Sequence, residues 1–329
     1  MIEAFYTDEF VLPLPPGHRF PMEKYRILRD KVKRSNCSIN LLIPPAATPG
    51  QLALAHCPDY VGRIEQGNVS SDEQREIGFP WSELMVERSK RSTGATVAAV
   101  RSALMHGASV NLAGGTHHAK HDRGGGFCVF NDMAVAARVF QTDFLYQSTV
   151  GHLASFPQAA QKAIPRVLVV DLDVHQGDGT AEILAGDDSI FTFSMHGQKN
   201  YPFVKARSDL DVELPDGTGD CEYLQQLESA LCHVLERFEP QLLLYVAGLD
   251  AHEADRLGRL SLSDEGIRLR DHAVLKFAEK LNLPVAAAMA GGYFRDLEHL
   301  TDLQLGTIER LARYGAHYAG QVELRNNSN

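Results

Sequence analysis

Short runs of consecutive hydrophobic residues recur along the chain and alternate with stretches of helical periodicity. The clearest runs are Val110–Ala113, Val167–Val170, Ile190–Phe193, Leu242–Ala247 and Val285–Ala290. Because neighbouring positions in each run are apolar, each is predicted to form a strand that is buried on both faces. Strands that alternate with helices predict an α/β fold, with a mostly parallel sheet of about eight strands and helices on both faces.

Helices are predicted between these strands, over residues 93–105, over 224–238, from 264 onward and over 300–311. Gly107 follows the first of them and suits a helix C-cap. Ser263 precedes two acidic residues and is predicted to N-cap the third, where negative charge is favourable. The proline-rich segment Pro13–Pro21 instead indicates an irregular loop.

Polar residues follow four of the predicted strands directly, at positions 114–118, 171–179, 248–250 and 291–293. The carboxyl ends of parallel strands share one edge of the sheet, and ligands bind at that edge. These four segments, which are far apart in the sequence, are therefore expected to meet in space.

Asp171, Asp173 and His175 alternate with apolar residues. In an extended chain their side chains point to the same side. Two buried carboxylates beside an imidazole need a neutralising cation, so this segment predicts a divalent metal site. Oxygen ligands with one imidazole suit zinc or a similar metal. Asp173 and His175 would supply two ligands and Asp250 the third, although Asp250 alone could equally cap a helix.

His117 and His118 form a second candidate site on a glycine-rich turn. Such a pair is often only a surface feature. Here, Asp171 and Asp178 lie in the neighbouring segment, and each could orient one imidazole as a carboxylate does in hydrolase triads.

Net charge, cysteine positions and the length of apolar runs argue against several classes of protein. The 329 residues carry a formal net charge of −10, which argues against nucleic-acid binding and favours cationic partners such as lysine-rich segments or polyamines. The five cysteines are scattered without a C-x-x-C pair, which predicts a reducing compartment and no cysteine-based zinc site. The first residues do not resemble a signal peptide, and no apolar run is long enough to span a membrane. We therefore expect a cytoplasmic protein without membrane or direct nucleic-acid contacts.

The motifs resemble the histone deacetylase family, within the larger arginase–deacetylase fold. The resemblance runs from about Leu12 to Leu311 and rests on residues 114–119, 125–128, 171–179, 247–250 and 291–293. Residues 122–127 and 255–263 are most similar to class IV enzymes and their bacterial relatives. The resemblance implies one deacetylase domain over residues 1–329, with one zinc ion per chain.

The resemblance also implies roles for individual residues. The zinc ligands would be Asp173, His175 and Asp250. His118, paired with Asp178, would act as general base on a metal-bound water and then as general acid towards the leaving amine. His117, paired with Asp171, would stay protonated longer and stabilise developing charge.

The remaining implied roles concern the substrate and a second cation. Tyr293 would donate its hydroxyl to the substrate carbonyl, Gly126 would offer its backbone carbonyl to the substrate amide, and Phe127 would line an acyl-lysine tunnel. Family members also hold a monovalent cation such as potassium beside the zinc, and the matching residues are Asp171, Ser194 and Met195.

Two departures from the family bear on the substrate and on assembly. Residues 141–164 are more numerous than class IV relatives have there, which predicts an inserted loop that lines the entrance or mediates homo-oligomerisation. Leu257 occupies a position where eukaryotic acetylpolyamine deacetylases carry an acid, so it would form an apolar wall and favour acyl-lysine. An acetylpolyamine amidohydrolase, a long-chain deacylase and a non-catalytic regulator that binds an acylated ligand remain alternatives.

Overall fold

The computed structural model describes residues 1–150 and 164–326, and in these residues it contains one sheet of eight parallel strands. The strands are β1 (Ile2–Phe5), β2 (Ile39–Leu42), β3 (Ala108–Asn111), β4 (Val167–Asp171), β5 (Ile190–Gly197), β6 (Leu210–Leu214), β7 (Leu242–Val246) and β8 (Val285–Ala288). Their order across the sheet is β2-β1-β3-β8-β7-β4-β5-β6. The predicted fold class is confirmed.

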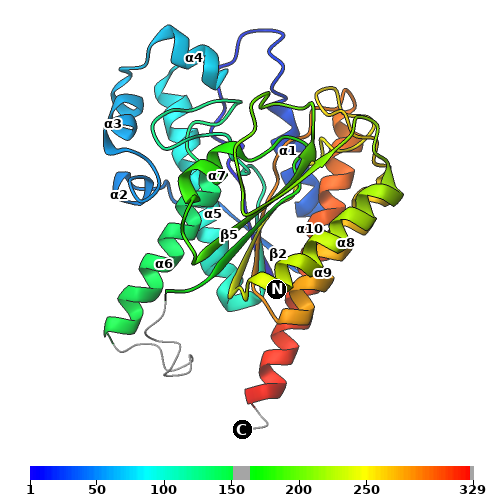
Figure 1. The fold of residues 1–329 in the computed structure, drawn as a ribbon. Helices are drawn as coiled ribbons and strands as arrows, with labels where there is room; N and C mark the ends of the chain where they lie inside the picture. Colours follow the sequence, from blue (N-terminus) through cyan, green and yellow to red (C-terminus); the bar gives the residue numbers. More distant parts are fainter. Residues whose placement is uncertain (151–163, 327–329) are drawn as a thin grey trace.

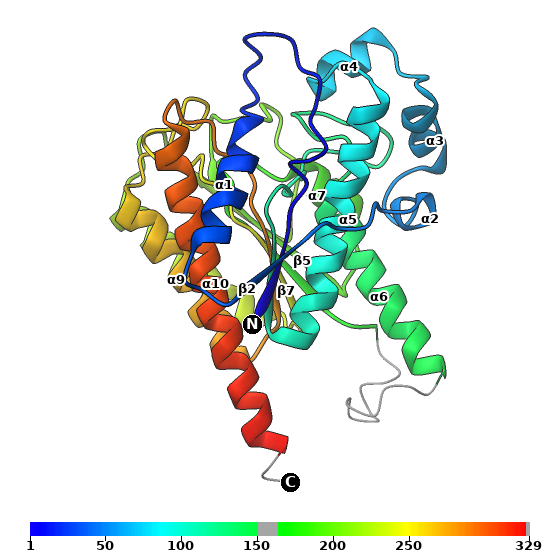
Figure 2. The same cartoon turned by 180° about the vertical axis from the view of Figure 1, so that it is seen from behind.

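Helices cover both faces of the sheet (Figures 1 and 2). One face is covered by α5 (Glu83–His106), α6 (Asp132–Val150) and α7 (Asp178–Leu184). The other is covered by α1 (Glu23–Arg34), α8 (Asp220–Arg237), α9 (Asp264–Leu281) and α10 (Leu297–Asn326). The short helices α2 (Pro49–Leu52), α3 (Pro58–Gln66) and α4 (Ser71–Ile77) lie beside α5.

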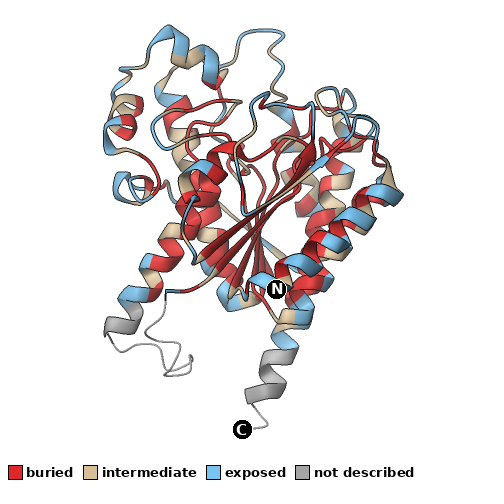
Figure 3. Ribbon diagram, viewed as in Figure 1, coloured by how far each residue is buried: buried red, intermediate tan, exposed pale blue. Residues whose placement is uncertain are grey.

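The strands near the middle of the sheet are buried throughout, which explains their consecutive apolar residues (Figure 3). In β4, Leu168 and Val170 belong to the core on one side of the sheet, whereas Val167 and Val169 belong to the core on the other. All five predicted strands are present, with ends shifted by a few residues. The loops that follow β3, β4, β7 and β8 gather at the carboxyl edge of the sheet, which is uppermost in Figure 1.

The predicted helix ends agree with the structure at Gly107 and Ser263. Helix α5 ends before Gly107, which has a positive φ of 79°. It begins earlier than the predicted residue 93 because the Ser82 side chain caps it by accepting from the Met85 N–H. The Ser263 hydroxyl accepts from the Gly266 N–H at 3.1 Å and caps α9. The segment from Pro13 to Pro21 contains neither helix nor strand, as predicted.

The loop predicted to begin at Gln141 is wrong in its first part, because residues up to Val150 continue helix α6. Phe140 and Phe144 are one helical turn apart and buried, with ring centroids 6.3 Å apart, so apolar packing extends the helix. The Gln141 side chain donates to the Ser189 hydroxyl at 2.8 Å. The rest of the predicted loop, residues 151–163, lies outside the described residues. No helix in the described residues is long and apolar enough to cross a membrane.

Candidate active site

The polar segments that follow β3, β4 and β8 line one cavity of about 1170 Å³, and Asp250, which follows β7, contacts His175 in its wall. Its lining includes five of the predicted site residues that carry a titratable side chain, namely His117, His118, Asp173, His175 and Tyr293. The expectation that these segments meet is confirmed. The cavity therefore brings histidines, carboxylates and a tyrosine to one place.

Asp173, His175 and Asp250 form a compact cluster of possible metal ligands. The His175 Nδ1 lies 3.0 Å from Asp173 Oδ1 and 3.1 Å from Asp250 Oδ2. One donor atom from each residue lies within 4.8 Å of the other two. Ligands about 2.0–2.2 Å from a tetrahedral zinc ion are separated by similar distances. The cluster is therefore a candidate site for a divalent metal ion.

The charges in this cluster also favour a cation. Asp173 and Asp250 are both buried. Burial and then the neighbouring Asp173 carboxylate raise the pKa of Asp250 to about 7. Burial opposes protonation of His175, but hydrogen bonds to Asp173 and Asp250 raise the pKa of His175 to about 10. With no cation present, the cluster would hold extra protons, and a divalent ion would neutralise the same charge.

Backbone groups hold the two carboxylates in place. The Gly291 N–H donates to Asp173 Oδ2 and the Val174 N–H donates to Asp250 Oδ1, each at 2.8 Å. A Cβ on residue 291 would lie 1.8 Å from Asp250 Oδ2 and 2.6 Å from Asp173 Oδ2. Glycine is therefore required at position 291 if both carboxylates are to keep these positions.

Each of the paired histidines contacts a buried carboxylate. His117 Nδ1 lies 2.7 Å from Asp171 Oδ2, and His118 Nδ1 lies 2.7 Å from Asp178 Oδ1. The centroids of the two imidazole rings are 4.2 Å apart. The structure thus brings each histidine to the aspartate that the family resemblance assigns to it.

The two histidines differ in their environments. Burial, followed by repulsion from His117, lowers the pKa of His118 to about 4. For His117, burial is outweighed by the Asp171 and Asp173 carboxylates, which raise its pKa to about 9. The pair therefore combines a neutral imidazole with a protonated one at neutral pH.

Tyr293 is held by Asp255 and Arg256, two residues that the sequence did not indicate as part of the site. Its N–H donates to Asp255 Oδ2 at 2.6 Å, and its carbonyl accepts from Arg256 Nε at 2.7 Å. The buried Lys24 ammonium donates to the Gly292 carbonyl and lies 5.4 Å from the Tyr293 ring centroid. Asp255 and Arg256 belong to residues 255–263, which resemble the family. Nothing in the sequence around them indicates that they bind the backbone of Tyr293.

Asp132 is a second residue that sequence reasoning missed. Its carboxylate accepts from the Gly115 N–H at 2.9 Å and from the Thr116 N–H at 2.7 Å. The buried Thr96 hydroxyl donates to the same carboxylate. Asp132 therefore fixes the turn that leads into the histidine pair. A single carboxylate at this position of the sequence does not by itself indicate such a role.

Gly126, Phe127 and Leu257 all line the cavity, and their role in substrate binding stays a prediction. Gly126 and Phe127 both have positive φ, of 55° and 68°. A Cβ on Gly126 would lie 2.6 Å from His118 Cδ2, so only glycine allows the loop to approach that ring. The Phe127 N–H donates to the Ile77 carbonyl at 2.7 Å, and the ring centroid lies 6.2 Å from that of Tyr293.

The residues matched to a monovalent cation lie on adjacent strands. Asp171 on β4 is the register partner of Ser194 on β5, and Met195 follows it and is buried. The Ser194 hydroxyl lies 3.0 Å from His196 Nδ1. The monovalent-cation site stays a prediction.

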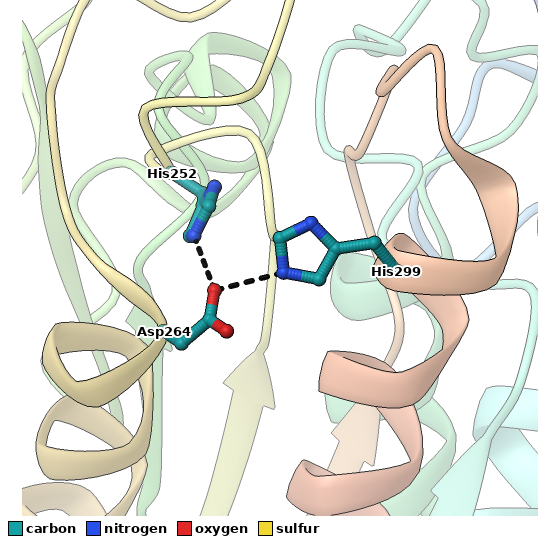
Figure 4. Close-up of side chains that lie close together, drawn as sticks. All are labelled: His252, Asp264 and His299. Atoms are coloured by element: carbon teal, nitrogen blue, oxygen red, sulfur yellow. Dashed lines mark hydrogen bonds and ion pairs between the residues drawn. The ribbon is translucent and has the colours of Figure 1, made fainter.

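A second cluster, His252, Asp264 and His299, lies outside this cavity (Figure 4). Both imidazole Nε2 atoms contact Asp264 Oδ1, at 2.9 Å for His252 and 2.8 Å for His299. His252 Nδ1 accepts from the Ala254 N–H at 3.0 Å, so the ring proton is on Nε2. Because a metal ligand must be unprotonated, this arrangement favours a structural hydrogen bond over a metal site.

The chain matches the family model described as the histone deacetylase domain over residues 18–304. An uncharacterized protein from Picosynechococcus is 40% identical over 297 residues, which cover 90% of this chain and 93% of that protein. Histone deacetylase 2 from Arabidopsis thaliana is 34% identical over 229 residues, which cover 69% of this chain and 54% of that protein.

Solved structures show the same fold. A crystal structure of a histone deacetylase homologue in complex with SAHA has a TM-score of 0.76 and 25% identity, and the match covers 94% of this chain and 84% of that one. The comparisons therefore agree with the resemblance that the motifs indicate.

Proposed function

Because this chain belongs to the histone deacetylase family of the arginase–deacetylase superfamily, we propose that it is a zinc-dependent deacylase. Its substrate would be an N-ε-acetyl-lysine or longer acyl-lysine, and the reaction would be hydrolysis of the side-chain amide. The observation that carries this proposal is that Asp173 and His175, which contact Asp250, line the same cavity as His118 and Tyr293.

Asp173, His175 and Asp250 are the proposed zinc ligands, since their donor atoms already converge within the spacing that the ion needs. Zinc bound there would polarise the amide carbonyl and lower the pKa of a bound water to about 7. Three protein ligands leave a position for substrate, which is typical of catalytic rather than structural zinc.

His118 is the proposed general base and acid. Its Nδ1 donates to Asp178, which leaves the Nε2 lone pair free to take a proton from the attacking water. A depressed pKa keeps this imidazole neutral at physiological pH, as a base requires. The same Nε2 would then return the proton to the amine nitrogen, which is a poor leaving group unless it is protonated. His117 would remain protonated beside it and stabilise negative charge.

Tyr293 is the proposed hydrogen-bond donor to the substrate carbonyl oxygen. Burial and the nearby Asp173 and Asp250 carboxylates raise the pKa of its hydroxyl, so the proton stays on the oxygen that must donate it. The Gly126 carbonyl would accept from the substrate amide N–H. Phe127 and Leu257 would contact the alkyl chain of the acylated amine, because both line the cavity.

The experiment that tests this proposal measures zinc content and turnover on the same preparation. Zinc is quantified by mass spectrometry, and hydrolysis is followed with an acetyl-lysine peptide, a myristoyl-lysine peptide and N-acetylspermidine. We expect about one zinc per chain, hydrolysis of an acyl-lysine peptide and loss of turnover with a chelator. Preference for acetylspermidine would favour a polyamine enzyme instead. A zinc-loaded protein that hydrolyses none of the three would be a binding protein.

A further inference from the structure

The exposed charges around the cavity mouth differ in sign from the chain as a whole. Among the described residues that line the cavity, the exposed charged side chains are those of Arg19, Arg75, Lys199, Arg256, Arg259 and Glu76. Five of these six are cationic, although the chain carries a net charge of −10. Charge at the mouth of a cleft attracts ligands of the opposite sign more strongly than charge elsewhere on the surface.

Neighbouring carboxylates neutralise only part of this charge. Asp72 pairs with Arg75, and Asp216 lies 3.6 Å from Lys199 and 3.3 Å from Arg259. Within residues 1–150 and 164–326, neither Arg19 nor Arg256 forms an ion pair with a carboxylate. The five cationic side chains are therefore opposed by three carboxylates, those of Asp72, Asp216 and Glu76. This leaves a net positive charge at the mouth.

Arg256 is positioned to bind an anion. Its Nε donates to the Tyr293 carbonyl, which anchors the exposed guanidinium beside the residue proposed to contact the substrate carbonyl. The two Nη groups make no hydrogen bond to a described residue, so they are available to a carboxylate. A guanidinium fork matches the two oxygens of a carboxylate, and an anchored fork loses less conformational entropy on binding.

The mouth also presents apolar surface. Phe203 lines the cavity with 85% of its surface exposed, and Val204 beside it is 87% exposed. The Phe203 ring centroid lies 6.3 Å from that of Tyr201, whose ring meets the His118 ring edge-on with centroids 4.8 Å apart. Exposed apolar residues next to a cavity favour a peptide, which can cover them, over a small hydrophilic amine.

We propose that this deacylase selects acyl-lysines flanked by carboxylates in a peptide, and that it discriminates against lysine-rich peptides and polyamines. The inference rests on the proposed function and adds the charge of the substrate. A polyamine or a lysine-rich segment would place a second ammonium group among the mouth cations, where like charges repel. Glutamate or aspartate near the acylated lysine would instead meet Arg19, Arg256 and their neighbours.

The test uses three acetyl-lysine peptides that differ only in their flanking residues, which are glutamate, alanine or lysine. We expect kcat/KM at low ionic strength to be about tenfold higher for the acidic than for the basic peptide, with the neutral one between them. The preference should shrink at about 0.5 M salt, because the screening length falls to a few ångströms. A difference caused only by peptide shape would not depend on salt.

Charge reversal tests which residues are responsible. The triple variant Arg19→Glu, Lys199→Glu and Arg259→Glu should reverse the ratio of acidic to basic turnover. The matched control Lys33→Glu, Lys276→Glu and Lys280→Glu changes net charge equally at exposed sites that do not line the cavity, and it should keep the ratio. The melting temperature of each purified variant shows whether it is folded. The ratio of acidic to basic turnover is compared because it does not depend on the fraction of protein that is folded.

The outcomes separate this inference from the proposed function. Hydrolysis of the neutral peptide with equal or greater turnover of the basic peptide overturns the charge inference alone. A zinc-loaded protein that hydrolyses none of the three peptides overturns the proposed function and the inference with it. An unchanged ratio in the triple mouth variant overturns the assignment of selectivity to these residues.

Discussion

The main-chain N–H of Tyr293 donates to the Asp255 carboxylate at 2.6 Å. The other oxygen of Asp255 accepts from the N–H groups of Leu257 and Gly258, at 2.7 and 2.9 Å. One side chain thus ties the loop after β7 to the turn after β8. Since Tyr293 is the proposed carbonyl-oxygen donor, Asp255 is a positioning residue for it.

Asp255→Asn should lower kcat while the KM and the zinc content change little. An asparagine can still accept from Leu257 and Gly258, but its NH2 group would face the Tyr293 N–H. We expect kcat to fall on the order of 10- to 100-fold, because small displacements of a reacting group are costly. Asp296→Asn is the matched control, since Asp296 also accepts backbone N–H bonds, from Glu298 and His299, but none from Tyr293. Loss of zinc in Asp255→Asn would contradict the positioning role.

Gly291→Ala should abolish tight zinc binding. The new methyl group would displace Asp250 and Asp173, whose oxygens lie 1.8 and 2.6 Å from the Cβ position. Zinc content after dialysis measures the effect. Gly62→Ala is the control, because Gly62 is in helix α3 and, apart from its chain neighbours and its own helix backbone, nothing lies within 4 Å of its Cβ position. Full zinc occupancy in Gly291→Ala would mean that these carboxylates are not the ligands.

Tyr293→Phe and Asp250→Ala should both lose turnover, but for different reasons. Removing the Tyr293 hydroxyl deletes one donor to the developing oxyanion and should cost on the order of a hundredfold or more in kcat, with zinc retained. Asp250→Ala removes a proposed ligand and should lose the metal. Zinc analysis and steady-state kinetics on both proteins distinguish the two effects. The reverse pattern would show that the assigned roles are wrong.

His56 should make folding stability depend on pH. It is fully buried, its Nδ1 donates to the Lys120 carbonyl and its Nε2 accepts from the Asn131 N–H at 2.8 Å. Burial lowers its pKa to about 4, whereas the unfolded chain has a pKa near 6.5. The unfolded state therefore binds the proton first, and stability is lost as pH falls from about 6.5 to 4.

The measurement is the free energy of unfolding in urea at several pH values for the natural protein and for His56→Gln. His118 and His196 also have pKa values lowered by burial to about 4, so only the difference between the two proteins isolates His56. We expect that difference to change by up to about 3 kcal/mol between pH 7 and pH 4. A difference that is constant with pH would contradict the prediction.

Local sequence patterns predicted the central strands and the cluster that follows them. Val167–Val170 reads as a buried strand because its side chains enter the cores on both sides of the sheet. Asp173 and His175 could be identified because they alternate with apolar residues immediately after that strand. The approach of Asp250 followed from a general property of parallel sheets, namely that their carboxyl ends share an edge.

Contacts between distant residues could not be predicted in this way. Asp255 and Tyr293 are separated by 38 residues, and Lys24 reaches Gly292 across 268. The strand β2 was not predicted, because its residues are only partly buried at the edge of the sheet and include a polar Asn40. The extra length after Gln141 predicts a loop, whereas helix α6 continues to Val150, because chain length alone does not reveal that a helix continues.

The strand order has a consequence for how the chain is made. In the sheet, β3 pairs with β1 on one side and with β8 on the other, although β8 is the last strand to be synthesised. As the polypeptide leaves the ribosome, one edge of β3 has no partner until most of the chain has emerged. Unpaired edges of this kind promote aggregation, so this edge of the sheet is protected only once β8 has paired with it.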